Sequence, residues 1–128
     1  MDASSVILVG PPKADYSPSI TITRERLAAP QTAAQYGDSQ LAALQQQFAD
    51  HGYSVKQDGP FKAGSLAGYE RIHAFRVSGV NGEIQQWQVY VIAGSDAITI
   101  TSTDLATTFE ASLPLFQEAV RQFKTLKV

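Results

Sequence analysis

The sequence predicts an α+β domain: an antiparallel β-sheet flanked by two main helices, in the order β-β-α-β(n)-α. A capping box that begins at Thr32 indicates the start of one helix, and apolar residues recur in steps of three and four from Phe109 to Phe123. An Asn-Gly pair at Asn81 separates two strand-like segments and predicts a β-hairpin. With 128 residues, of which 44% are hydrophobic, we expect residues 1–128 to form a single domain with one core.

Two strands are expected before the first helix. Residues 6–9 are apolar and mostly β-branched and are followed by a Gly-Pro-Pro stop, while residues 20–23 alternate isoleucine with threonine. The first helix is expected over residues 32–50, because its apolar residues form one stripe and Gly52 suits the position after a helix end. This stripe comprises Tyr36, Leu41, Leu44 and Phe48.

Several antiparallel strands are expected after this helix. The pattern predicts strands over residues 53–56, 61–64, 69–78, 84–92 and 97–102. Turns are expected at Gly59-Pro60 and at Gly68, because glycine and proline commonly interrupt strands.

The last helix is expected over residues 112–126. Pro114 suits the first turn of a helix, where its missing N–H costs nothing. Phe116, Val120 and Phe123 fall on one side of this helix, so we expect them to be core residues.

The residue types do not favour catalysis, metal binding or nucleic-acid binding. The formal net charge is −2 and the chain has no cysteine, which excludes disulfides and thiolate zinc sites. His51 falls near a helix end and His73 within a strand, without further ligands at suitable spacing. The segment Gly64-Ser65-Leu66-Ala67-Gly68 has the outer glycines of a nucleophile elbow, but its middle residue is Leu66 and a strand-turn-helix context is missing. We therefore expect neither an enzyme, a metal nor a cofactor.

Amide and hydroxyl side chains follow the predicted strands in alternating positions. Gln86 and Gln88 share one face of their strand, while Trp87 belongs to the other. Ser19, Thr21 and Thr23 form a similar hydroxyl row. Such rows are typical either of a solvated sheet face or of a concave surface that binds an apolar segment and satisfies its polar groups.

Several short motifs resemble the DcrB-like domain. They are residues 5–9, residues 19–25, Tyr36 with Gln40-Leu41, Gly68-Tyr69-Glu70, residues 86–91, residues 98–102, and the closing Phe109, Phe116 and Phe123. The resemblance covers nearly the whole chain and implies the PsbP/Mog-like fold, which agrees with the predicted order of elements. It also implies similarity to the Eag chaperones of type VI secretion, which are dimers that cradle hydrophobic N-terminal helices of effectors.

The resemblance further implies a client-binding groove. By position, its floor would include Val6, Leu8 and Thr21, and its polar contacts would come from Ser19, Thr23, Gln40 and Gln88. Thr21 stands where these chaperones tend to have an aliphatic residue, so this groove would be more polar.

Two functions remain open at this point. The first is a non-catalytic chaperone or adaptor that forms a homodimer and shields hydrophobic helical segments of a secreted effector. The second is a domain of an exported protein that carries a lipid or small molecule. The first residues lack the basic and apolar segments of a signal peptide, so we expect a cytoplasmic protein, or a periplasmic one if the N-terminus has been trimmed. We expect no nucleic-acid partner and no stable membrane insertion.

Overall fold

Six antiparallel strands and two helices make up the computed structural model, which describes residues 3–9, 18–63 and 66–123. For β1, Ala63, Leu66 and Phe123 it describes the backbone alone. The strands are β1 (Ala3–Val9), β2 (Ser19–Arg26), β3 (Ser54–Ala63), β4 (Leu66–Phe75), β5 (Ile84–Ala93) and β6 (Asp96–Leu105), and the helices are α1 (Ala33–Gln47) and α2 (Phe109–Phe123). The strand order β1-β2-β6-β5-β4-β3 confirms the predicted α+β antiparallel fold.

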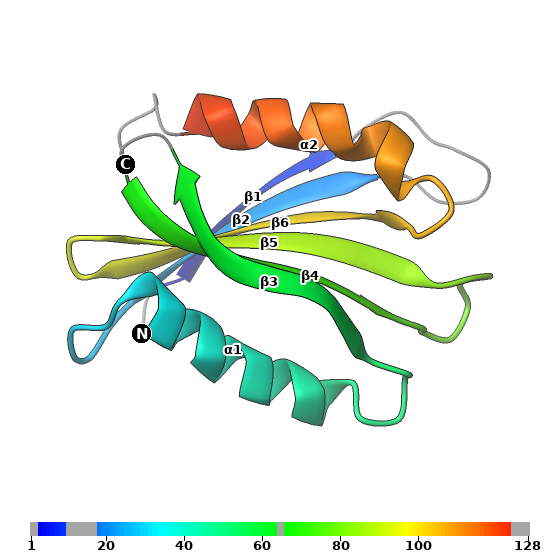
Figure 1. Ribbon diagram of the computed structural model, residues 1–128, viewed down its shortest axis with the longest axis horizontal. Coiled ribbons are helices and arrows are strands. Elements are labelled where there is room, and N and C mark those ends of the chain that lie inside the picture. Colours follow the sequence, from blue (N-terminus) through cyan, green and yellow to red (C-terminus); the bar gives the residue numbers. More distant parts are fainter. Residues whose placement is uncertain (1–2, 10–17, 64–65, 124–128) are drawn as a thin grey trace.

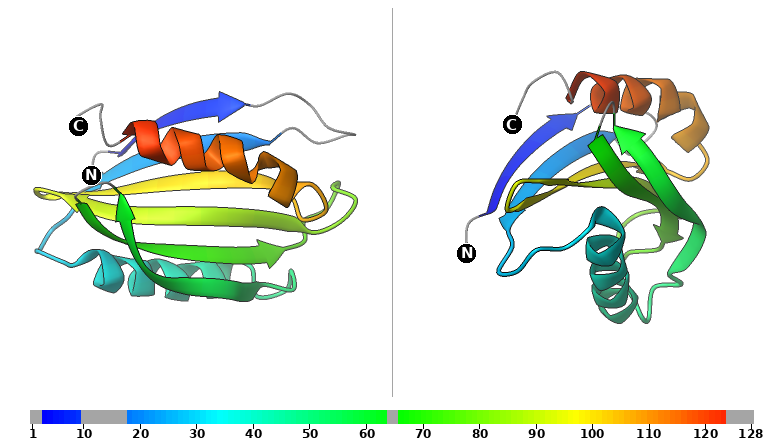
Figure 2. Two further views of the ribbon diagram at one scale, coloured as in Figure 1. Left: turned by 45° about the horizontal axis from the view of Figure 1, so that its top comes forward. Right: turned by 60° about the vertical axis from the view of Figure 1, so that its left-hand side comes forward.

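The two helices lie on opposite faces of the curved sheet (Figures 1 and 2). α1 packs against β4 and β5, whereas α2 packs against β6. Each face of the sheet is therefore covered by a different helix, and we call the two faces the α1 face and the α2 face. Within the described residues, neither helix has the length and apolar character of a membrane span.

The ends of α1 follow the local signals in the sequence. The Thr32 hydroxyl accepts a hydrogen bond from the Gln35 backbone N–H at 3.1 Å, and the Gln35 side chain accepts one from the Thr32 backbone N–H at 2.9 Å. This reciprocal pair satisfies two N–H groups that the helix itself cannot bond. After the helix, Gly52 has a φ of 66°, a conformation that favours glycine.

The last helix begins earlier than predicted. α2 starts at Phe109 rather than near Ser112, so Pro114 lies inside the helix and not in its first turn. The Thr108 carbonyl accepts hydrogen bonds from the N–H groups of Ala111 and Ser112, and the Ser112 hydroxyl donates to Asp104 at 2.6 Å. The local bonds to Thr108 and the tertiary bond to Asp104 stabilise an added first turn despite the hydrogen bond that proline removes.

The turns predicted at Gly59-Pro60 and Gly68 were wrong. β3 continues through Gly59 and Pro60, and Gly68 lies within β4, opposite Phe61 and Val91. Proline is tolerated because β3 is an edge strand and needs no donor on its outer side. A Cβ on Gly68 would lie 2.8 Å from the Tyr90 carbonyl oxygen, so glycine permits close contact between β4 and β5.

The main core lies between the sheet and α2. Phe116 and Val120 are 0% and 3% exposed, which confirms them as core residues. They pack with apolar residues of three strands: Ile20, Trp87, Val89, Val91, Ile98 and Ile100. The side chain of Phe123 lies outside the described residues.

Candidate functional site

The α1 face carries rows of polar side chains that cross several strands. Gln88 of β5 pairs with Thr101 of β6, which in turn pairs with Thr21 of β2. Since cross-strand partners share a face, Gln88 and Thr21 belong to one row. Two parallel rows contain Ser19 and Thr23. The register therefore brings all three predicted β2 positions onto the face of Gln88.

α1 adds a side wall to this face. Gln40 of α1 lines a hollow of about 310 Å³ together with Thr23 of β2 and Gln88 of β5. Tyr36 of α1 and Thr101 of β6 also line it. We call the surface formed by these five residues the α1-face groove. Three predicted positions from three separate elements thus meet at one place, whereas their role in client binding stays a prediction.

The α1-face groove continues along α1 toward the start of the helix. A neighbouring hollow of about 620 Å³ shares Tyr36 and Gln40 with it and adds Leu27 and Ala28 from the segment that follows β2. The combined surface therefore offers both hydrogen-bonding and apolar groups along one side of the helix.

The predicted positions Val6 and Leu8 are not paired with the hydroxyl row of β2. Val6 pairs with Ile22 and Leu8 pairs with Ile20, whereas the hydroxyl row of β2 pairs with other residues of β1. Ile20 belongs to the core of the α2 face. The side chains of Val6 and Leu8 lie outside the described residues, so their part in the client-binding groove stays a prediction.

A buried arginine fixes one wall of the α1-face groove. Arg71 of β4 is 0% exposed, and its Nη1 group donates to the Gly37 carbonyl of α1 at 3.0 Å and to the Tyr90 hydroxyl at 3.1 Å. The Tyr90 hydroxyl donates in turn to the Gln88 side-chain carbonyl, whose amide donates to Thr101 at 3.2 Å. This chain of hydrogen bonds holds the Gln88 amide in one orientation.

Burial of Tyr90 favours its protonated form. The loss of water around the ring raises the pKa of Tyr90 to about 12, although the Arg71 charge and hydrogen bond act in the opposite direction. Tyr90 is therefore a hydroxyl donor throughout the physiological pH range, as its bond to Gln88 requires.

A second chain of hydrogen bonds runs parallel to the first. His73 of β4 is fully buried, and its Nε2 lies 2.7 Å from the carbonyl oxygen of the Gln86 side chain. Because that oxygen can only accept, Nε2 carries the proton and Nδ1 accepts from the Tyr53 hydroxyl at 2.8 Å. The Gln86 amide donates to Thr103 at 3.1 Å. These contacts give His73 a structural role at the sheet.

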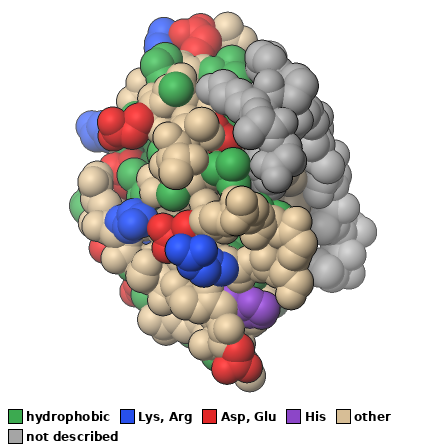
Figure 3. Space-filling view, turned by 90° about the vertical axis from the view of Figure 1, so that its right-hand side faces the viewer, with side chains coloured by type: hydrophobic (Ala, Val, Ile, Leu, Met, Phe, Trp, Pro, Cys, Tyr) green, Lys and Arg blue, Asp and Glu red, His purple; other side chains and the backbone are tan. Residues whose placement is uncertain are grey.

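Charged groups of both signs, Arg24 and Glu25, line the same hollow as Tyr36. The Tyr36 hydroxyl donates to the Glu25 carboxylate at 2.7 Å. Burial raises the pKa of Tyr36 well above its usual value, and the bond to Glu25 raises it further. On the face drawn in Figure 3, basic and acidic side chains lie next to one another, so charges there offset each other locally.

The α1-face groove offers hydrogen-bond donors and acceptors from Tyr36, Gln40, Gln88 and Thr101. Within the described residues, no three acidic or histidine side chains gather as metal ligands. The sequence reasoning did not identify Arg71 as a support of the site. Its alternation with Tyr69 and His73 along β4 was a usable signal, because residues two apart share a face.

This combination of elements defines a PsbP-like α+β fold, an antiparallel sheet with a helix on each face. Among solved structures, the chain is similar to the protein of unknown function PA94 from Pseudomonas aeruginosa, with a TM-score of 0.81 and 17% identity over 94% of this chain and 82% of that one. It is also similar to the PsbP protein CyanoP from Synechocystis sp. PCC 6803, with a TM-score of 0.60 and 11% identity over 90% and 76% of the two chains. No protein-family profile and no curated protein sequence matches the chain. At these identities the structural similarity establishes the fold.

Proposed function

We propose that the protein is a non-catalytic chaperone or adaptor whose α1-face groove holds a hydrophobic helical segment of another protein. The observation that carries this proposal is the meeting of Thr23, Gln40 and Gln88 in one hollow, although they come from β2, α1 and β5. The two glutamines and the threonine provide donors and acceptors at the same place.

The chemistry of the α1-face groove suits a helix that contains small and polar residues. Such a helix presents backbone carbonyls and serine or threonine hydroxyls beside its apolar side chains. The amides of Gln40 and Gln88 can bond these polar atoms, while the Tyr36 ring, Leu27 and the neighbouring alanine contact apolar ones. Bonding both kinds of atom lowers the cost of removing the segment from water.

The proposal includes the client and the assembly that the family resemblance implies. The client is a segment of a secreted effector, of the type VI kind, held in the cytoplasm before export. A second copy of the chain completes the groove, because the two neighbouring hollows of one copy, of about 310 and 620 Å³, are together too small to enclose several turns of a helix that is about 10–12 Å across. No reaction step belongs to this function.

A labelled synthetic helix tests the proposal. The probe is a transmembrane-like peptide of leucine, alanine and serine, and its binding is measured by fluorescence anisotropy and its aggregation by light scattering. We expect the wild-type protein to bind it and to suppress its aggregation. Gln40→Ala should weaken binding by about two- to twelvefold, since one hydrogen bond contributes about 0.5–1.5 kcal/mol.

Gln46→Ala is the matched control, because Gln46 lies on the same helix but is exposed and outside the α1-face groove. Equal binding by the Gln40 and Gln46 variants would reject the groove. The mass of the complex, measured by multi-angle light scattering, tests the dimer: a single protein copy per peptide would contradict it.

A further inference from the structure

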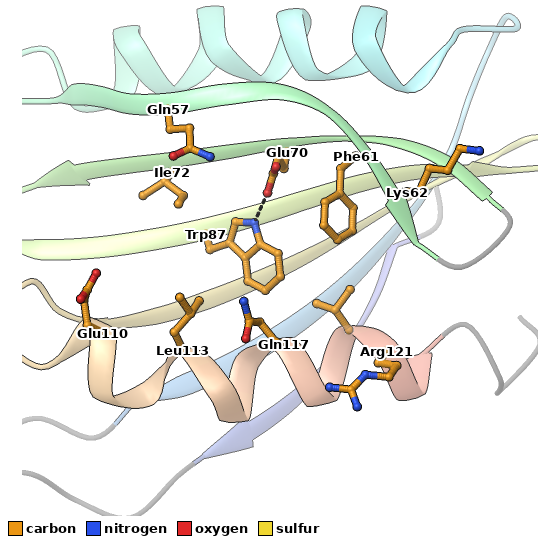
Figure 4. Close-up of a pocket in the computed structure, with 11 residues that line it drawn as sticks. Gln57, Phe61, Lys62, Glu70, Ile72, Trp87, Glu110, Leu113, Gln117 and Arg121 are labelled. Atoms are coloured by element: carbon orange, nitrogen blue, oxygen red, sulfur yellow. Dashed lines mark hydrogen bonds between the residues drawn. The ribbon is translucent and has the colours of Figure 1, made fainter.

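A second and larger cleft lies on the α2 face, on the opposite side of the sheet from the α1-face groove. Its volume is about 710 Å³, and it opens between α2 and the strands β3, β4 and β5 (Figure 4). Cavities of roughly 300–1,000 Å³ are the size that small-molecule ligands occupy. We call it the α2-face cleft.

The floor of the α2-face cleft is apolar. Trp87 forms its centre and is 5% exposed, with Phe61 packed against it edge to face at 5.8 Å between ring centroids. Ile72 and Leu113 add aliphatic surface. The Trp87 indole N–H donates to the Glu70 carboxylate at 2.8 Å, so the polar atom of the indole is already bonded within the wall.

The charges around the α2-face cleft are arranged unequally. Lys62 from β3 and Arg121 from α2 lie at one end, and Glu110 lies at the other (Figure 4). Lys62 is exposed and, within the described residues, has no carboxylate within 4.0 Å. Arg121 bonds Glu118 at 2.6 Å through one N–H group, and a guanidinium has further N–H groups to donate. Glu70 lies between these ends, with its carboxylate bonded to the Trp87 indole N–H. The end with Lys62 and Arg121 therefore attracts an anion, while the end with Glu110 repels it.

We propose that the α2-face cleft binds a single-chain amphiphile with an anionic head, such as a fatty acid. The apolar chain lies across Trp87 and Phe61, and the carboxylate lies between Lys62 and Arg121. Glu110 disfavours the reverse orientation. This site is independent of the proposed function on the α1 face, and it gives a specific location to the carrier function expected as the alternative.

The single tryptophan of the chain makes this proposal directly measurable. Because Trp87 is the one tryptophan in the sequence, intrinsic fluorescence reports on the floor of the α2-face cleft. Dodecanoate with a bromine atom at the end of its chain quenches tryptophan on contact. We expect saturable quenching below the micelle concentration, with at least tenfold weaker binding for dodecanol and for the cationic dodecyltrimethylammonium.

Two variants test the two halves of the site. Lys62→Glu should weaken dodecanoate binding by about three- to tenfold, because it turns an attraction at the surface into a repulsion. Gln117→Phe places an aromatic ring where Gln117 lines the cleft and should abolish binding. Binding by these variants is measured by calorimetry, since a new ring near Trp87 also alters its fluorescence.

The controls match these changes away from the α2-face cleft. Arg76→Glu changes the net charge equally at an exposed residue between β4 and β5, and Gln46→Phe adds the same ring to the exposed side of α1. Both should bind dodecanoate like the wild type. Equal affinity for the anionic and cationic amphiphiles, or wild-type binding by Lys62→Glu and Gln117→Phe, would overturn the proposal.

Discussion

Both ring nitrogens of His73 are engaged in hydrogen bonds that suit the neutral imidazole. Nε2 donates to Gln86, and Nδ1 accepts from Tyr53. A protonated ring would have two N–H groups, so the Tyr53 hydroxyl would lose its acceptor. Burial lowers the pKa of His73 below 6.5, and the nearby charge of Arg71 lowers it further, against the opposing bond to Gln86.

The stability of the protein should therefore depend on pH through His73. Its folded-state pKa lies below the unfolded value of 6.5, so the unfolded state binds the proton more readily. The free energy of unfolding should fall as the pH is lowered from 7 to 5, by at most about 1.4 kcal/mol per pH unit for one proton. Urea denaturation followed by circular dichroism at each pH measures this slope.

Substitution of each histidine in turn shows which one causes the pH dependence of the free energy of unfolding. His73→Gln removes the titrating group from the buried position and should flatten the dependence between pH 7 and 5. His51→Gln, at a half-buried position after α1, should retain it. A steep slope that survives in the His73 variant would contradict the assignment.

For single residues, the sheet face of a side chain was easier to predict than its partner on the neighbouring strand. Strict alternation placed Gln88 and Trp87 on opposite faces of β5, and the structure agrees. Alternation cannot say which residues of the next strand lie alongside, because that depends on register. Thus the pairing of Leu8 with Ile20, rather than with the threonine that follows it, was not visible in the sequence.

At the scale of elements, α1 lies in tight contact with the sheet at Gly37. A Cβ added there would lie 2.9 Å from Cδ2 of Tyr69 and 3.3 Å from Cδ2 of Tyr90. The Gly37 carbonyl also accepts the hydrogen bond from Arg71. A glycine in the helix thus lets α1 contact β4 and β5 without a gap.

Gly37→Ala should destabilise the protein although alanine favours helices. Overpacking costs about 1–3 kcal/mol. Because the added Cβ would lie only 2.9 Å from the Tyr69 ring, we expect a cost above the roughly 1 kcal/mol that alanine adds through helix propensity. Thermal denaturation should show a lower midpoint for this variant. Gly59→Ala is the matched control, because a Cβ there meets nothing within 4 Å. An unchanged or raised midpoint for Gly37→Ala would show that α1 tolerates displacement.

Element boundaries were predictable where the signals are local. The capping box at Thr32 requires contacts between residues three apart, and it marked the start of α1 correctly. Gly68 and Pro60 have the residue types of turns, but their positions depend on neighbouring strands. The start of α2 likewise depends on Ser112 bonding Asp104, a tertiary contact.

At the scale of the whole molecule, the two faces of one sheet have different chemistry. The α2 face packs aliphatic and aromatic side chains around Phe116, while the α1 face carries hydrogen-bonded rows around Gln88. The apolar face contributes most to stability, since burial of apolar area is the main favourable contribution to folding. The polar face is therefore free to carry a binding site.

Phe116→Ala should lower the free energy of unfolding by about 3–5 kcal/mol, because it leaves a cavity beneath α2. Phe116 packs in a cluster that joins α2 to β2, β5 and β6, so near- and far-ultraviolet circular dichroism should report one common transition. Leu115→Ala is the control on the same helix, where Leu115 is 47% exposed. Similar losses for the two variants would contradict the core assignment.

The site was predictable only in part because it combines distant elements. Thr23 and Gln88 were found as members of polar rows, and Gln40 through the family resemblance, before the hollow that joins them was known. No sequence pattern indicated the α2-face cleft, because Lys62 and Arg121 are far apart in the sequence. Packing of α2 against β6 determines that they meet at one end.

The edge strand β3 also affects whether a strand of another molecule can pair with the sheet. It carries Pro60, exposed lysines and a register shift between Val55 and Gln57. A missing donor, charged side chains and a bulge each oppose hydrogen bonding of another strand to a sheet edge. β3 is thereby protected against edge-to-edge aggregation, and growth of the sheet by strand addition is disfavoured on that side.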